Sequence, residues 1–197
     1  MMKRINLIII LITSILSIVL AYNKHEDLVL FLKDIAVILT ISVIYILQKI
    51  FKFKISDSLN FIYIIFIFMA HFLGVVVNLY DKIYWFDKFV HFLSGIITSF
   101  VSLYVIIKFK KNDNIKFTII YIIAFSLMCA SLWEIFEYLS SYYFNVDPQK
   151  VQMTGVTDTM GDIIVAFLGS ILVSLSYYYE YIYTKNYLIK KYIKSIK

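Results

Sequence analysis

Three pairs of ionisable residues stand at spacings that place both side chains on one face of a helix. The pairs are Asp87 with His91, Glu134 with Glu137, and Asp158 with Asp162. Residues three or four positions apart are neighbours on a helix surface, so each pair can direct two ligands at one point. One or two imidazoles with several carboxylates suit Zn²⁺, Mn²⁺ or Fe²⁺, whereas carboxylates alone suit Mg²⁺ or Ca²⁺. The spacings therefore indicate a polar site that could bind a divalent metal ion, with all six residues as candidate ligands.

The same residues allow chemistry without a metal. Close carboxylates repel one another, which raises the pKa of at least one of them. Such a group can act as a general acid or base, or relay protons. Glu134, Glu137 and Asp162 are the candidates for these catalytic roles. His71 is a peripheral candidate, because its place near the middle of an apolar run favours a hydrogen bond between helices.

Helix capping offers a structural explanation for only some of these residues. Asp87 and Asp158 begin their apolar runs, where a carboxylate accepts hydrogen bonds from free N–H groups and suits the helix dipole. Glu134 and Glu137 lie near the C-terminal end of theirs, where the dipole disfavours negative charge. A functional or buried-network role is therefore expected for the two glutamates. His91 could instead hydrogen-bond a neighbouring helix.

Long apolar runs carry the candidate site. The chain has 197 residues, of which 61% are hydrophobic and 16% charged, against about 45–50% and about 25% in soluble domains. A membrane-spanning helix needs about 20 apolar residues. Six runs approach or exceed that length, at residues 5–22, 28–50, 58–80, 87–107, 115–142 and 158–183. The sequence predicts an all-α polytopic membrane protein with one membrane domain of six transmembrane helices, and excludes an ordinary soluble enzyme.

Two features bear on the continuity of these helices. The first run follows Lys3 and Arg4 and could be a signal peptide, but its 18 residues exceed the usual 7–15 of such a segment, which favours an uncleaved span. The only proline, Pro148, lies between the last two runs. The helices are therefore expected to be largely unbroken.

Basic residues orient the chain. Most of its 19 Lys and Arg residues lie at the N-terminus, in segments 49–54 and 108–116, and at the C-terminus. The positive-inside rule then places both termini in the cytoplasm and residues 145–157, including Gln149, outside a bacterial cytoplasmic membrane. The positive charge is a topology signal and predicts contact with anionic lipid headgroups rather than with nucleic acid. The oligomeric state stays open.

The last four runs each carry one face of small and polar residues. In lipid such faces turn inward, so these runs are expected to form a functional bundle with the first two outside it. The pair Lys33 and Asp34 is expected at the interface, with the lysine extended toward water. Glu134 lies at a depth that matches His91 and Asp162 and is expected to meet His91, directly, through water or through a metal.

The stretches that carry these residues resemble a known family. Segments 70–74, 87–92, 133–137 and 158–162 are similar to the YjdF family of bacterial inner-membrane proteins, over about residues 58–175. The resemblance implies a multi-pass membrane protein and no particular substrate. A weaker similarity runs to VanZ-like membrane proteins, linked as a family to glycopeptide tolerance. The chain departs from that pattern at Glu137, where glutamine is expected, and at Ala166, where asparagine is expected.

Three functions are compatible with these observations. The first is an outward-facing metal or acid/base site that acts on a lipid or cell-envelope substrate, with water as the nucleophile. The second is a proton- or cation-coupled carrier, which ranks lower because no ionisable residue follows Thr98 and Ser102 toward the cytoplasm. The third is a membrane scaffold whose charged residues hold helices together.

Overall fold

The computed structural model describes residues 2–23, 28–50, 52, 55, 57–109, 114–144, 147–183 and 188–196. Within these ranges the regular elements are helices, and six of them are long and apolar enough to cross a membrane. They are Met2–Tyr22, Phe31–Ile50, Leu59–Val76, Phe86–Lys108, Ile115–Phe144 and Thr157–Ile182. The predicted all-α fold with six membrane spans is confirmed. His25 lies outside the described residues.

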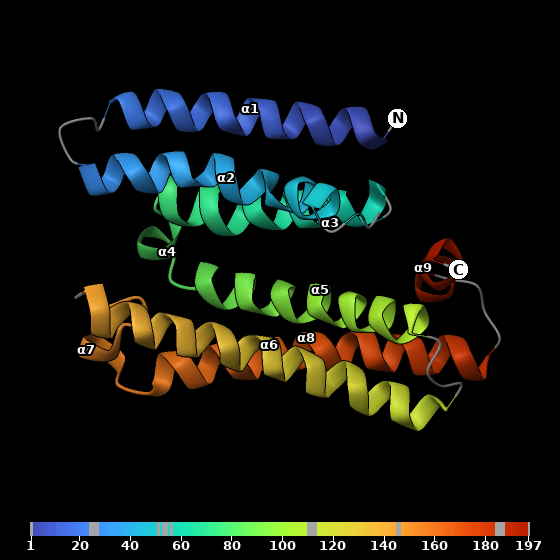
Figure 1. The fold of residues 1–197 in the computed structure, drawn as a ribbon. Helices are drawn as coiled ribbons and strands as arrows, with labels where there is room; N and C mark the ends of the chain where they lie inside the picture. Colours follow the sequence, from blue (N-terminus) through green and yellow to red (C-terminus); the bar gives the residue numbers. More distant parts are fainter. Residues whose placement is uncertain are drawn as a thin grey trace. The chain divides into compact units, whose positions relative to one another are not determined.

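Residues Met1–Val90 form one compact unit and His91–Lys197 a second. In the first unit, α1 (Met2–Tyr22) and α2 (Leu28–Ile50) lie side by side, and α3 (Asp57–Ile67) packs against both (Figure 1). The buried face of α1 consists of Asn6, Thr13, Ser17 and Ala21, whereas Leu11 is 60% exposed. Small and polar residues inside with large apolar residues outside are typical of a helix surrounded by lipid.

The third span is not the uninterrupted α-helix that the absence of proline predicts. It changes at Phe68 into a π-helix, η1 (Phe68–Val76), in which the Val77 N–H bonds to the Phe72 carbonyl at 3.0 Å. Asn78 then adopts a left-handed conformation with φ 64°, and the short helix α4 (Leu79–Lys82) follows. The wider π-turn and the left-handed residue end the span at Val76, so polar residues beyond it do not share one regular face with His71.

The second unit contains the last three spans. It is built from α5 (Phe86–Lys108) from His91 onward, α6 (Ile115–Phe144), α7 (Val151–Thr154), α8 (Thr157–Ile182) and α9 (Leu188–Ile196). The helices α6 and α8 run alongside each other, α7 lies at the start of α8, and α9 lies against its far end (Figure 1). Phe100, Ile122, Val173 and Ile189 form an apolar core cluster from α5, α6, α8 and α9. The helix α5 is continuous across the boundary between the units, so its first turn keeps regular helical spacing to the rest.

The division into units differs from the expected grouping of spans. The third span packs against α1 and α2 in the first unit, whereas the sequence suggested that it would join the last three. Its partners there include Val37 on α2, which packs with Phe72 and Val76 of η1. Apolar side chains therefore hold the third span against α2. From the sequence alone, these side chains could equally have faced lipid.

Candidate functional site

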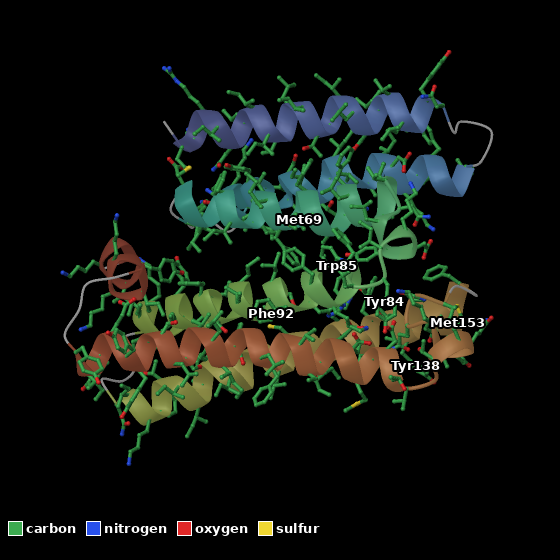
Figure 2. All side chains as sticks on the ribbon, turned by 180° about the vertical axis from the view of Figure 1, so that it is seen from behind. Met69, Tyr84, Trp85, Phe92, Tyr138 and Met153 are labelled. Atoms are coloured by element: carbon green, nitrogen blue, oxygen red, sulfur yellow. The ribbon has the colours of Figure 1, made fainter. Side chains whose placement is uncertain are left out.

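The helices α5 and α8 approach each other at backbone distance. A Cβ atom added to Gly95 would lie 2.0 Å from the Ala166 carbonyl oxygen, and one added to Gly169 would lie 2.4 Å from the Phe92 carbonyl oxygen. Phe92 lies on α5 beside α8 (Figure 2). Only glycine leaves room for such a contact, as is common where membrane helices pack closely. This contact sets the register between the two helices.

One turn before this contact, each helix places an ionisable residue. His91 precedes Gly95 by four residues, and Asp162 precedes Ala166 by four. Their side chains meet, with 3.8 Å between His91 Nε2 and Asp162 Oδ1. Both residues are buried, at 8% and 2% exposure. Because the helices run in the same direction from a shared contact, the pairing of these two residues follows from the register.

Asp87 joins this pair from the first turn of α5. It stands one turn before His91, and one ligand atom from each of Asp87, His91 and Asp162 lies within 4.8 Å of the others. We call these residues the three-residue group. Asp87 is partly exposed, and the Lys88 ammonium lies 3.8 Å from one of its oxygens. The group therefore combines one imidazole, two carboxylates and a cation at its edge.

The helix α6 is the third helix of this region, and it contributes an inward face of small and polar residues. Ser126, Ala130 and Glu134 are buried in the order that the sequence periodicity predicts. The Thr98 hydroxyl of α5 donates to Ser126 Oγ at 3.0 Å, which ties α6 to α5. Glu134 is 5% exposed, so the expectation that it faces the protein rather than lipid is confirmed. It lies outside the three-residue group, and its contact with His91 stays a prediction.

Gln149 is a site residue that sequence analysis missed. Its amide Nε2 donates to both the Glu134 carboxylate, at 3.0 Å, and the Glu134 backbone carbonyl, at 3.1 Å. Gln149 is 7% exposed, so the expectation that it is an accessible loop residue is wrong. The contact brings Gln149, just before α7, against α6 at Glu134. Nothing in the local sequence distinguishes this glutamine from a solvated one.

The structure places the remaining candidates at the edge of the site or away from it. Glu137 is partly buried and its Oε1 accepts a hydrogen bond from Trp133 Nε1 at 2.8 Å, within α6 itself. Asp158 is partly buried in the first turn of α8. Neither belongs to the three-residue group. Their assignment as metal ligands stays a prediction.

His71 belongs to the first unit, where it connects two helices. Its Nδ1 lies 2.9 Å from Thr40 Oγ1 of α2, which confirms the interhelical hydrogen bond expected for it. Asp34, on the same helix as Thr40, is 2% exposed, and its neighbour Lys33 is exposed. Successive residues on a helix point about 100° apart, so Asp34 can be buried while Lys33 is exposed. The place of this pair at the membrane interface stays a prediction.

Three serine hydroxyls of α5 that follow His91 donate hydrogen bonds to backbone carbonyls of the same helix. Ser94 donates to the His91 carbonyl, Ser99 to the Gly95 carbonyl, and Ser102 to the Ser99 carbonyl, each at 2.7 Å. Hydroxyls that satisfy carbonyls of the preceding turn act as small packing residues. They favour close helix contact over a continuous polar pathway.

Comparison with known proteins identifies relatives of the chain. A family model with the description "Predicted membrane protein (DUF2238)" matches residues 5–182. The chain is also similar to an uncharacterised protein of Thermotoga maritima, with 24% identity over 126 residues. That alignment covers 64% of this chain and 64% of the other protein's length. No solved structure matches the chain.

Proposed function

Because the chain belongs to the DUF2238 family of predicted membrane proteins, we propose that its three-residue group binds a divalent metal ion within the membrane domain. The observation that supports this is the convergence of Asp87, His91 and Asp162 within 4.8 Å, with two of the three buried. Burying two ionisable groups is costly unless they are paired or coordinate a metal. A bound cation would neutralise the two carboxylates and occupy the imidazole nitrogen.

The donor set fits a catalytic rather than a purely structural metal. Catalytic zinc sites use three protein ligands and keep a position open for water or substrate. Ligand atoms at about 2.0–2.2 Å from Zn²⁺ lie at most about 4.4 Å apart. The ligand atoms of the three-residue group lie within 4.8 Å of one another, so they would move slightly closer together to bind the ion. A mixed imidazole and carboxylate set also suits Mn²⁺ and Fe²⁺, and Mg²⁺ less well.

We place the substrate among lipids or other components of the cell envelope. His91 and Asp162 each lie five residues after the first residue of their helices, so they sit roughly 5–10 Å from the helix ends, at the depth of lipid headgroups. A metal there would supply an activated water for hydrolysis. Glu134 is the group proposed to accept or donate a proton, and Glu137 is the second candidate for this role. The similarity of the same segments to YjdF proteins supports a bacterial inner-membrane location.

Elemental analysis of the purified full-length protein tests the metal. We expect close to one equivalent of Zn, Mn or Fe per chain after purification in detergent, or after loading with each ion and washing. His71→Ala is the control, because His71 binds Thr40 in the first unit and should leave the metal content unchanged. Less than about a tenth of an equivalent after loading with every ion would reject the metal site and favour a proton carrier or scaffold.

Orientation is tested by cysteine labelling. In a Cys129→Ala background, Met153→Cys should react with a membrane-impermeant maleimide in intact cells, because Met153 is 86% exposed on α7 (Figure 2). Asn114→Cys, at the exposed start of α6, should react only after the membrane is opened. The opposite labelling pattern would place the three-residue group on the cytoplasmic side.

A further inference from the structure

The short C-terminal helix α9 is held against the second unit by a buried carboxylate. Glu180 of α8 is 3% exposed. Its two oxygens accept hydrogen bonds from the Ile189 and Lys190 backbone N–H groups at 2.9 and 2.7 Å. The first N–H groups of a helix lack partners within the helix, and a carboxylate is the acceptor that the helix dipole favours. Glu180 therefore fixes where α9 begins.

A second contact fixes the direction of α9. The Tyr192 hydroxyl donates to the Phe100 carbonyl of α5 at 3.0 Å, and the two rings meet edge to face at 5.1 Å. Burial, and to a smaller extent the nearby Tyr104, raises the pKa of the Tyr192 hydroxyl, so it remains a donor. Ile189 is 1% exposed. The apolar side of α9 is thus docked on α5 and α8.

The other side of α9 is basic. At 100° per residue, Lys191 and Lys194 lie on the face away from Ile189 and Ile193, and Lys190 lies between that face and the apolar side. Lys191 and Lys194 are exposed, and Lys190 is partly buried. Glu180 already occupies the first amides of α9, so an anion at this helix would meet the lysine ammonium groups. A helix with one apolar and one lysine-rich face is typical of a membrane interface.

An apolar cavity of about 600 Å³ opens beside this helix. Its lining is mainly apolar, with Ile96, Phe100, Leu172, Leu175 and Ile189, and also includes Glu180. Its size falls within the roughly 300–1,000 Å³ of small-molecule sites. Leu172 and Leu175 are 50% and 62% exposed on a membrane-spanning helix, so the cavity is continuous with the surface that lipid chains cover. The α8 residues that line the cavity run from Leu172 to Glu180, which places them about 15–27 Å along the helix from Asp162 at 1.5 Å per residue.

We propose that this cavity and the lysines of α9 form a binding site for an anionic phospholipid, with an acyl chain in the cavity and the phosphate at Lys190, Lys191 and Lys194. One residue of α9, Ile189, lines the cavity, and three lysines follow it on the same helix. This combination selects an amphiphile with a negative headgroup. A neutral lipid would fill the cavity without using the lysines, and free phosphate would use the lysines without the cavity. Anionic lipids are abundant in the cytoplasmic leaflet, where the basic residues place the C-terminus.

Native mass spectrometry of the full-length protein in detergent tests the headgroup contact. Wild-type protein should retain dioleoyl phosphatidylglycerol at least tenfold better than dioleoyl phosphatidylcholine. Combining Lys190→Gln, Lys191→Gln and Lys194→Gln should weaken phosphatidylglycerol binding by on the order of 100-fold, at roughly fivefold for each lysine. The control combines Lys3→Gln, Lys49→Gln and Lys116→Gln, three exposed lysines elsewhere. Equal losses in both triple variants, or no preference in the wild type, would overturn the site.

A second pair of variants tests the cavity. Leu172→Trp should fill the cavity and reduce phosphatidylglycerol binding at least tenfold, whereas Leu168→Trp, one turn earlier and 49% exposed, should not. This pair decides the question even if the lysine variant fails to fold. Unchanged binding in Leu172→Trp would refute an acyl chain in the cavity. Displacement of the lipid by millimolar inorganic phosphate would assign the lysines to free phosphate. If the wild type forms dimers and Leu172→Trp does not, with lipid binding unchanged, the cavity would be assigned to a second copy of the chain.

Discussion

Asp162→Asn is expected to lower the affinity of the proposed site for a divalent metal ion by more than 100-fold while the helices remain folded. Asparagine keeps the shape of the side chain and loses the negative charge that a metal requires. Removing an outer partner of a ligand already costs about 10–100-fold in affinity, so loss of a direct ligand should cost more. Asp162 is 2% exposed beside His91, and replacing a buried charge by a neutral amide should leave the metal-free protein equally stable. Titration with Zn²⁺ against a chromophoric chelator measures the change.

Glu137→Gln is the matched control for this variant. Glu137 is a partly buried carboxylate of the same unit that accepts a hydrogen bond from Trp133 and lies outside the three-residue group. It should change metal affinity by less than about threefold. An equal loss in both variants would mean that Glu137 belongs to the ligand set after all. Full metal binding by Asp162→Asn would contradict the proposed site.

Gly95→Ala should push α5 away from α8 and weaken metal binding at the three-residue group, although Gly95 lies one helical turn from His91. Its new Cβ would lie 2.0 Å from the Ala166 carbonyl oxygen, which is backbone and can yield only if a helix moves. Inserting a methyl group into a packed interior costs about 1–3 kcal/mol, and here the cost should reach or exceed the upper end of that range. The same movement would draw His91 away from Asp162. Metal affinity and thermal stability should therefore fall together.

Gly74→Ala provides the comparison for this prediction. A Cβ at Gly74 would lie 2.3 Å from a ring carbon of Tyr80, a side chain that can rotate aside. It should therefore destabilise the protein less than Gly95→Ala and leave metal affinity unchanged. Thermal unfolding in detergent, followed by circular dichroism, measures the stability of both variants, and titration with Zn²⁺ measures their metal affinity. Equal stability of Gly95→Ala and the wild type would show that α5 and α8 do not meet at backbone distance.

The sequence by itself determined the class of fold and the inward face of each long helix. Apolar runs of about 20 residues identify membrane spans because a bilayer leaves no water to satisfy exposed backbone groups. Charged and small residues point away from lipid, so periodicity alone placed Glu134, Asp162 and His91 inside. The structure buries all three.

The tertiary structure decided which of these inward residues meet. Periodicity describes one helix and carries no information about its partner or register, so the approach of Gly95 to Ala166 had to be seen before His91 and Asp162 could be paired. The same holds for Gln149, which lies fifteen residues after Glu134 and meets it only in the folded chain. It also holds for the third span, where a π-helix begins without proline and Val37 of α2 packs against it. Contacts between distant segments depend on shape complementarity in three dimensions, which a pattern along one chain does not contain.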